Sequence, residues 1–325
     1  MENLVLIDWL SATFKTPLIK SDDKKTQLEY AEQFVSAMGL DLGDFEVADG
    51  PNGKNNRLWL DGINIHLPSD NKDYCWLEMS GSGCRAFETY GNGNWNSLLE
   101  WCVYNTNIKR LDCAFDDHSG ILDMKQLVID TYFNRSFVSR SHYHEVQLSF
   151  DDRTGDEGTS IYHGRECSNI LIRIYDKAAQ LRRMDEKWNR VEIQMRNENA
   201  MEFAQKFLQD DSVGSLFRGV LAYYLRYCES SDSDSNRWRW PIASYWQVLI
   251  DNAESIKLLT TPGVEYNMTK LENYVIHQAG NSIWTYIQAF GYMTFRDKLE
   301  KSLPPEIPFK YRDLLRRYKA GDINA

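Results

Sequence analysis

The sequence has little cysteine, no long apolar run and no excess of positive charge, and each shortage excludes a class of protein. Its six cysteines lie far apart without a Cys-x-x-Cys pair, which argues against a thiolate zinc site and a disulfide-stapled small fold. We expect them to be reduced, cytoplasmic thiols: Cys75, Cys84, Cys102, Cys113, Cys167 and Cys228. Because the N-terminus lacks a basic start and no apolar run reaches about 18 residues, we expect neither export nor a membrane span.

The net charge of −10 at first argues against a nucleic-acid partner, since phosphate binding depends on Lys and Arg. The distribution of charge weakens that objection. Residues 1–108 contain 16 Asp and Glu against 8 Lys and Arg, whereas residues 165–196 contain 8 Lys and Arg against 5 Asp and Glu. A local field decides where a polyanion binds, so residues 165–196 remain a candidate DNA surface.

Two regions of different character follow one another along the chain. Up to Arg196 most segments are short and β-prone, with Gly, Asn and Asp between them, and a few helical patterns interrupt them. Beyond Arg196, amphipathic helical patterns follow each other. We therefore predict an α+β fold, with an antiparallel sheet-rich catalytic domain and flanking helices over residues 1–200 and a helical region over residues 201–325.

Three of the predicted strands have one apolar and one charged face. Side chains alternate across a strand, so residues i, i+2 and i+4 share a face. If the three strands are neighbours, their charged faces form a single surface. It contains Arg110, Asp112 and Asp116 from the first strand, Arg173, Tyr175 and Lys177 from the second, and Arg190, Glu192 and Arg196 from the third.

This set of side chains has a chemical meaning. Asp112, Asp116 and Glu192 without cysteine suit a hard divalent ion such as Mg²⁺ or Mn²⁺, which can polarise a phosphoryl oxygen. A phenol has an ordinary pKa of about 10, and we expect neighbouring cations or a metal to favour the anion of Tyr175. The alternative is that these are solvated strand faces carrying ordinary Arg–Glu pairs.

Five ordered blocks of the sequence resemble the Rep_trans family of replication initiation factors, the rolling-circle initiators and relaxases of plasmids, integrative elements and some phages. The resemblance covers about residues 5–200 and extends loosely beyond them. The blocks are IDWLSATF (7–14), LEMSGSGCRAFE (77–88), RLDCAFDD (110–117), TSIYHGRECSNILIRIYDKAAQ (159–180) and RVEIQMRN (190–197).

The resemblance implies that the tyrosine of the block IRIYDK, Tyr175, attacks a DNA phosphodiester, and that acidic residues matched by Asp112 and Glu192 support a metal ion. We expect a 5′-phosphotyrosyl adduct and a free 3′-OH, with Arg173, Lys177 and Arg190 holding the scissile phosphate. Tyr162 and Tyr143 are the next candidates for the nucleophile. The alternative function is a non-catalytic DNA-binding regulator that retains the initiator fold.

Other short motifs have competing interpretations. SHYHE (141–145) places His142 and His144 two residues apart, a spacing that binds metal in a different nicking superfamily. RWRW (237–240) interleaves cations with aromatic rings, so Arg237 and Trp238 are candidate contacts to single-stranded DNA, and the alternative is a helix N-terminal staple that buries Trp238 or Trp240. Arg110, Arg190 and Arg196 of the charged strand faces are the other predicted DNA contacts. SGSG (80–83) lacks the phosphate-loop pattern and is expected to be a turn between strands. Besides origin DNA, a host helicase and a second copy of the chain are the partners considered.

Overall fold

The structure is a computed structural model of the whole chain. It describes residues 3–20, 22–50, 53–153, 157–183, 186–209, 212–231, 233–251, 257–258, 272, 275–276, 279–303, 315 and 318–319. The chain divides into two compact units, Met1–Thr260 and Thr261–Ala325, which are taken separately below.

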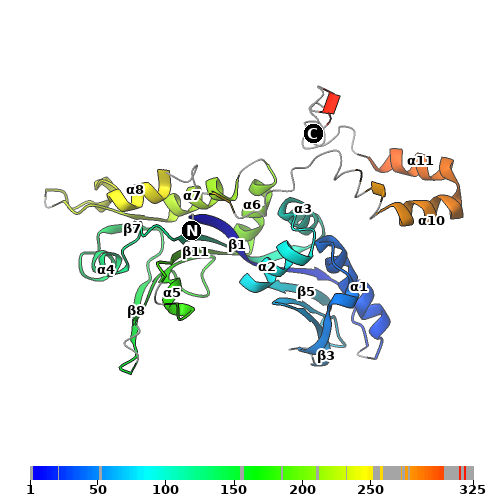
Figure 1. Cartoon of the computed structure of the whole chain (residues 1–325), viewed down its shortest axis with the longest axis horizontal. Coiled ribbons are helices and arrows are strands. Elements are labelled where there is room, and N and C mark those ends of the chain that lie inside the picture. The colour runs from blue at the N-terminus through cyan, green and yellow to red at the C-terminus, as the bar shows by residue number, and fades with distance from the viewer. Residues whose placement is uncertain are drawn as a thin grey trace. The chain divides into compact units, whose positions relative to one another are not determined.

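The first unit is built on one large sheet (Figure 1). Its strands follow the order β2-β3-β4-β5-β1-β6-β11-β10-β9-β8, with antiparallel neighbours, and β13 adds a short parallel pair to the start of β1. The strands are β1 (Leu4–Lys15), β2 (Glu46–Gly50), β3 (Gly53–Leu60), β4 (Ile63–His66), β5 (Tyr74–Met79), β6 (Asn107–Asp117), β8 (His144–Phe150), β9 (Glu157–His163), β10 (Ile170–Asp176), β11 (Asn189–Arg196) and β13 (Lys257–Leu258). The three strands with charged faces, β6, β11 and β10, are consecutive neighbours.

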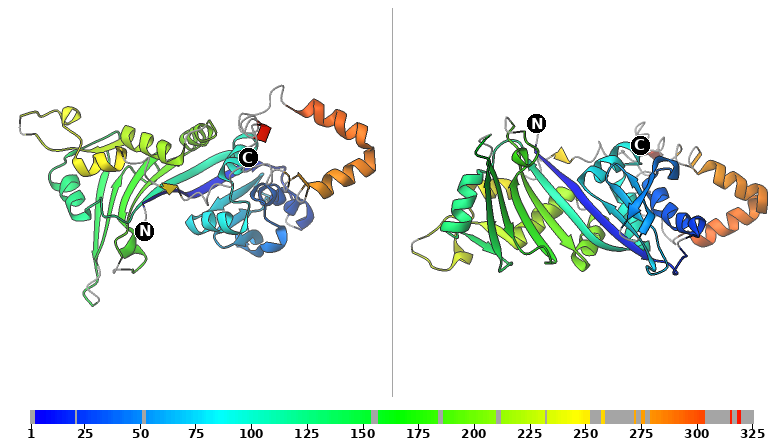
Figure 2. Two further views of the ribbon diagram at one scale, coloured as in Figure 1. Left: turned by 45° about the horizontal axis from the view of Figure 1, so that its top comes forward. Right: turned by 90° about the horizontal axis from the view of Figure 1, so that it is seen from below.

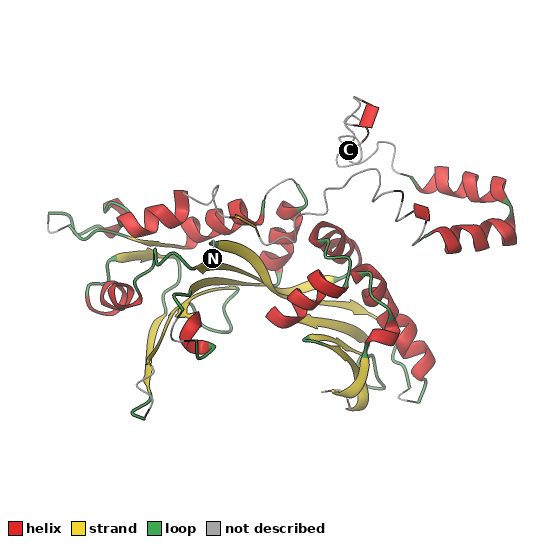
Figure 3. Cartoon of the chain, in the orientation of Figure 1, coloured by secondary structure: helices red, strands yellow, loops and turns green. Residues whose placement is uncertain are grey.

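Helices flank this sheet, as Figure 3 shows. They are α1 (Lys24–Met38), α2 (Gly81–Tyr90), α3 (Trp95–Asn105), α4 (Met124–Val128), α5 (Lys177–Gln180), α6 (Glu198–Phe207), α7 (Val213–Tyr224) and α8 (Ser244–Asp251). Short 3₁₀ helices cover η1 (Leu42–Asp44) and η3 (Arg237–Arg239), a π-helical turn covers η2 (Ile129–Phe133), and β7 (Phe137–Ser139) pairs with β12 (Leu225–Tyr227) in a second small sheet. The predicted α+β class is confirmed.

The apolar faces of the central strands form the core. Val5 and Ile7 of β1, Phe115 of β6 and Ile193 of β11 are buried in one cluster with residues of α6 and α7. The rings of Phe115 and Phe217 lie 6.4 Å apart, which ties β6 to α7. The apolar side chains of these strands are buried on one face of the sheet, and the charged side chains lie on the opposite face, as the alternation predicts. Figure 2 shows these strands side by side in two further views.

A β-bulge at Asp8 interrupts this alternation in β1. Ile7 pairs with Cys113 and Trp9 with Asp112, so Asp8 has no partner residue on β6. Leu4 and Leu6 pair with Asp116 and Ala114, so alternation already places Asp8 on the charged face, and the bulge brings the next side chain, Trp9, to that face as well. Arg85 of α2 donates from Nη2 to the carbonyl oxygen of Ile7 at 2.8 Å, which satisfies the backbone beside the bulge.

The motif SGSG opens helix α2, so its expected role as a turn between strands is wrong. Ser80 is the residue before the helix, and Gly81 is its first residue. Small residues are required here because a Cβ on Gly83 would lie 2.3 Å from the carbonyl oxygen of Gly62, and one on Gly81 would lie 2.8 Å from Oδ1 of Asp8. The glycines therefore let α2 begin directly against the bulged strand.

The helices α6, α7 and α8 belong to the first unit and pack beside the sheet, so this unit continues past residue 200. A functional division between residues 1–200 and 201–325 stays a prediction. The second unit contains α10 (Gly280–Phe290) and α11 (Tyr292–Ser302), joined at Gly291 and in contact through Tyr286 and Phe295. Most of the basic segment 310–319 lies outside the described residues. No helix in the described part of the chain is long and apolar enough to cross a bilayer.

Asp117, at the end of β6, fixes the chain that leaves the sheet. Its buried carboxylate accepts hydrogen bonds from the backbone N–H groups of Ser119, Gly120, Ile121 and Leu122, at 2.8–3.2 Å. Ser119 N–H also reaches Oδ1 of Asn3 at 3.2 Å, so the other three donors depend most on this one side chain.

Asp117→Ala should lower the free energy of unfolding by about 3 kcal/mol, because it leaves several backbone donors without an acceptor. Urea unfolding followed by circular dichroism measures this. The matched variant Asp22→Ala, at an exposed position, should change stability by less than about 0.5 kcal/mol. Equal stabilities of the two variants would contradict the role given to Asp117.

Candidate active site on the charged sheet face

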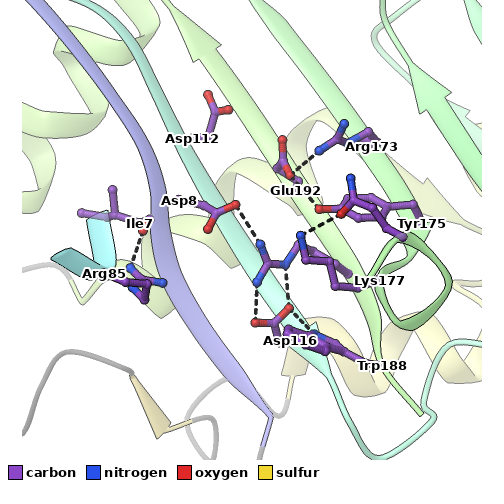
Figure 4. Close-up of polar contacts among 12 residues, drawn as sticks. Ile7, Asp8, Arg85, Asp112, Asp116, Arg173, Tyr175, Lys177, Trp188 and Glu192 are labelled. Atoms are coloured by element: carbon purple, nitrogen blue, oxygen red, sulfur yellow. Dashed lines mark hydrogen bonds and ion pairs between the residues drawn. The ribbon is translucent and has the colours of Figure 1, made fainter. Parts of the chain in front are cut away.

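The centre of the charged face is the buried guanidinium of Arg190 on β11. Its Nε and Nη2 donate to the two carboxylate oxygens of Asp116 at 2.6 and 2.7 Å, and its Nη1 donates to Asp8 at 2.8 Å. Trp188 donates to the same Asp116 at 2.7 Å. Three neighbouring strands, β1, β6 and β11, are thus joined by one side chain (Figure 4).

Tyr175 on β10 lies beside this centre. Its hydroxyl donates to Oε2 of Glu192 at 3.2 Å, and Arg173 donates to the same oxygen at 2.8 Å. The guanidinium of Arg173 lies 4.3 Å from the ring centre of Tyr175, and the ammonium of Lys177 lies 5.6 Å from it. The predicted assembly of Tyr175, Arg173, Lys177 and Glu192 on one surface is therefore present.

The ionisation of Tyr175 differs from what the sequence predicted. Burial raises the pKa of the phenol and Glu192 raises it further, although Arg190 and Arg173 act in the opposite direction. Arg190 and Arg173 favour the anion, as expected, but the expected ionised phenol is wrong, because the side chain is only 3% exposed and shares its site with a carboxylate, and these two effects outweigh the cations. The phenol is neutral in this arrangement and needs a base to lose its proton.

Three carboxylates on the face repel one another. Burial raises the pKa of Asp112 to about 7, Arg110 opposes that shift, and Glu192 and Asp8 add to it. The pKa of Asp8 is also raised, first by burial and then by Glu192, against the attraction of Arg190. The charge of Glu192 therefore acts on both Asp8 and Asp112, and each of the three carboxylates is paired with an arginine.

The donor chemistry of these carboxylates fits a hard divalent cation. Their positions, however, form no group of three or more acidic, histidine or cysteine ligands around one point among the residues the structure describes. Arginines occupy their oxygens instead, with Arg110 bound to Asp112 and Arg173 bound to Glu192. Asp116, the third predicted ligand, accepts three hydrogen bonds from Arg190 and Trp188.

The predicted DNA contacts lie in three different settings. Arg190 is buried and its donors are engaged. Arg110 and Arg196 line a cavity on the same sheet face. Arg237 and Trp238, on η3, line a different cavity together with His142 and His144.

His144 of the SHYHE motif belongs to a chain of hydrogen bonds with His163 and Tyr227. Nδ1 of His144 lies 2.9 Å from Nδ1 of His163, and Nε2 of His163 lies 3.0 Å from the hydroxyl of Tyr227. Burial lowers the pKa of His144, and it lowers that of His163 to about 3. His142 lies outside β8 and is exposed. In the described part of the chain these rings join no acidic cluster.

The alternative tyrosines are placed differently. Tyr162 pairs in register with Arg173 on the neighbouring strand β9, so it borders the site. Tyr143 is exposed and donates to Glu145 at 2.8 Å. Sequence reasoning missed Asp8, because the residues that share its face on β1, Leu4 and Leu6, are apolar, although it belongs to the first of the five resembling blocks.

Comparison with known proteins identifies a family, a relative and a solved structure that this chain is similar to. Residues 106–303 match the family described as "Replication initiation factor". This range contains β6, β10 and β11, and Asp8 lies before it. A protein of Bacillus subtilis (strain 168) that bears the name "Putative DNA relaxase NicK" is 23% identical over 330 residues, covering 97% of this chain and 90% of that protein. The solved structure of a rolling circle replication initiator protein from Geobacillus stearothermophilus superposes with a TM-score of 0.67 at 25% identity, covering 78% of this chain and 98% of that one.

The raised pKa of Asp112 predicts a pH-dependent loss of stability. The folded state holds this proton to about pH 7, whereas an unfolded aspartate loses it near its ordinary 3.8. The folded state therefore binds more protons between these values, and the free energy of unfolding falls as pH rises through them. Relative to Asp112→Asn, the free energy of unfolding of the natural chain should fall by about 2–4 kcal/mol between pH 4 and pH 8.

Urea unfolding across this pH range in the presence of EDTA measures the difference. Asp22→Ala serves as the matched control, because its changed carboxylate is exposed and should leave the pH slope unaltered. Parallel pH profiles for the natural chain and Asp112→Asn would show that Asp112 does not carry the linkage.

Proposed function

The chain belongs to the Rep_trans family of replication initiation factors, and from this premise we propose that it nicks one DNA strand at a replication origin through Tyr175. The product is a 5′-phosphotyrosyl adduct with a free 3′-OH, from which rolling-circle replication or mobilisation starts. The observation that supports this most directly is the hydrogen bond from the hydroxyl of Tyr175 to Glu192 amid Arg173 and Lys177.

Arg173 and Lys177 bind the scissile phosphate. Both are only partly buried and both lie over the ring of Tyr175, so they cover the phenol until a stronger partner arrives. A phosphodiester offers that partner, because it replaces the cation–π contact of Lys177 by a stronger charge-assisted hydrogen bond and gives Arg173 a phosphate in place of its ion pair with Glu192. Turning these side chains toward DNA exposes the phenol at the moment when the phosphate is in place.

Further donors on this face suit an anionic ligand. Nε of Arg173, Nε2 of Gln194 and Nε of Arg196 are buried without an acceptor in the described part of the chain. Buried donors are seldom left unpaired. A nucleic-acid backbone supplies phosphate oxygens along the face and gives these groups acceptors.

Glu192 is the general base. Its Oε2 already accepts the hydrogen bond of the Tyr175 hydroxyl, so it takes the proton as the phenolic oxygen attacks phosphorus. The bond from phosphorus to the 3′ oxygen breaks, and Lys177 gives that oxygen its proton. The pKa of Lys177 is lowered by burial and by Arg190, which makes it a better proton donor.

Arg190 has a positioning role in this proposal rather than a phosphate contact. It orients Asp116 and Asp8 through three short hydrogen bonds and adds fixed positive charge behind the site. A divalent cation would be held by Asp112 and Glu192, since Asp116 is engaged by Arg190 and Trp188, and when bound it would polarise a phosphoryl oxygen.

Tyr175→Phe should lower adduct formation by about 10³-fold or more, because only the attacking oxygen is removed. Supercoiled DNA of the chain's own replicon is incubated with Mg²⁺, and the adduct is mapped by mass spectrometry. Tyr162→Phe is the matched control on the next strand and should retain the adduct. If Tyr162→Phe loses the adduct and Tyr175→Phe keeps it, Tyr162 is the nucleophile.

Removal of divalent metal with EDTA should stop nicking, and Asp112→Asn should raise the Mg²⁺ concentration needed for half-maximal rate by at least about 10-fold. A neutral amide is a weaker ligand for a hard cation than a carboxylate. Asp117→Asn, on the opposite face, is the matched control and should keep the Mg²⁺ requirement of the natural chain. Nicking that persists in EDTA would overturn the metal part of the proposal.

The burial and raised pKa of Tyr175 favour one second candidate, a DNA-binding regulator that retains the initiator fold without chemistry. Binding to the replicon's origin without any nick or adduct, in Mg²⁺ and in Mn²⁺, distinguishes this function from the first.

A further inference from the structure

A cavity of about 700 Å³ lies on the same sheet face as Tyr175. It is lined by side chains of β1, β5, β6 and β11, among them Trp9, Trp76, Glu78, Arg110 and Arg196. Strand order places β1 three strands from β10, about 14 Å at the usual strand spacing, and Arg196 of the cavity lies six residues, about 20 Å, along β11 from Arg190, the register partner of Tyr175. The cavity and the candidate active site are therefore parts of one continuous surface.

One row of cross-strand neighbours forms the floor of the cavity. Glu78 pairs with Ser11, Ser11 with Arg110, and Arg110 with Arg196. Arg110 also binds Asp112, which acts electrostatically on Glu192 and so connects the cavity with the hydrogen-bond partner of Tyr175. The rim adds the cations Lys15 and Lys109.

The aromatic side chains of the cavity are held in fixed orientations. The indole of Trp76 stacks on His66 with ring centres 4.4 Å apart and donates from Nε1 to Ser11 at 2.7 Å. The guanidinium of Arg110 lies 4.3 Å from the ring centre of Trp9. Rings that are already fixed lose little conformational entropy when a planar ligand stacks on them.

Two donors in the lining have no acceptor in the described part of the chain. They are Nε1 of Trp9 and Nε of Arg196, and both atoms are buried. Fixed aromatic rings, cations at the rim and donors without acceptors are the combination that binds single-stranded nucleic acid, in which bases stack and phosphates pair with cations. A carboxylate on the floor, Glu78, can contact the polar edge of a base.

We propose that this cavity binds an unpaired nucleobase of the strand that carries the scissile phosphate, with the base stacked on Trp76. The proposal rests on the function proposed above. The pocket holds the strand about 20 Å or more from Tyr175, some nucleotides away from the nick, so that the base held at β1 and β5 sets which phosphate reaches Tyr175. It also gives an acidic chain a source of DNA affinity that does not depend on net charge.

The test measures the binding of octathymidylate and of an abasic octamer with the same phosphate backbone, at one fixed salt concentration. The Tyr175→Phe background is used so that no strand is cleaved. Loss of the bases should weaken binding by roughly 5- to 100-fold, the range expected when bases stack on aromatic rings. Trp76→Leu should weaken binding of octathymidylate and leave binding of the abasic octamer nearly unchanged.

Controls separate stacking from folding. Trp76→Phe keeps an aromatic ring and should retain most of the preference for octathymidylate, and thermal unfolding confirms that each variant is folded. Trp59→Ala changes a partly exposed indole on β3, outside the cavity, and should keep the full preference. Should Trp76→Leu not fold, Trp9→Leu takes its place in the same comparison.

The pocket is overturned if Trp76→Leu shows the same preference for octathymidylate as the unaltered Tyr175→Phe background. Where Trp9→Leu replaces Trp76→Leu, the same outcome in Trp9→Leu overturns it. Nicking of replicon DNA by the natural chain is measured separately. A chain that nicks while the preference is independent of Trp76 retains the proposed function and loses the pocket. If the preference depends on Trp76 but the natural chain does not nick, the pocket is retained and the proposed function is lost.

Discussion

The candidate site depends on one buried guanidinium. Arg190 joins strands β1, β6 and β11 through Asp8 and Asp116, and all three side chains are withdrawn from solvent to a large extent. Removing one partner of such a group leaves an unpaired charge in a poorly solvated place, which costs more than the contact itself contributes. The other charged side chains, including the phenol and its carboxylate partner, are arranged around this fixed positive charge.

Much of the fold and part of the site could be predicted from the sequence, because both follow from alternation along strands. The charged set of β6, β10 and β11 appears where the periodicity of two places it, and the neighbours expected are the neighbours found. Asp8 was not found in this way, since its neighbours on the same face of β1, Leu4 and Leu6, are apolar and β1 therefore shows no charged face in its residue pattern. The helix that begins at Gly81 was missed because its glycines serve a close tertiary approach rather than a turn.

The protonation and the partners of the site residues were harder to predict than which residues form the site. Listing cations around Tyr175 suggested an ionised phenol, but burial outweighs those cations and Glu192 works against ionisation. Whether a charge stabilises its neighbour depends on solvent access and on which other charges share the space. Neither quantity can be read from residue spacing. The same reason explains why Asp116, a ligand by sequence, is engaged by Arg190 and Trp188.

The order of strands in the sheet also determines when the site comes into being during synthesis. Its side chains come from positions as far apart as Asp8 and Glu192, and the strands that carry them pair across more than 70 intervening residues. Long-range pairings of this kind form slowly and need the whole intervening chain. A nascent or truncated polypeptide that ends before β11 has the tyrosine but lacks both its carboxylate partner and the central arginine. Under the function proposed above, such a fragment lacks the general base, so a broken translation product would not nick the DNA that encodes it.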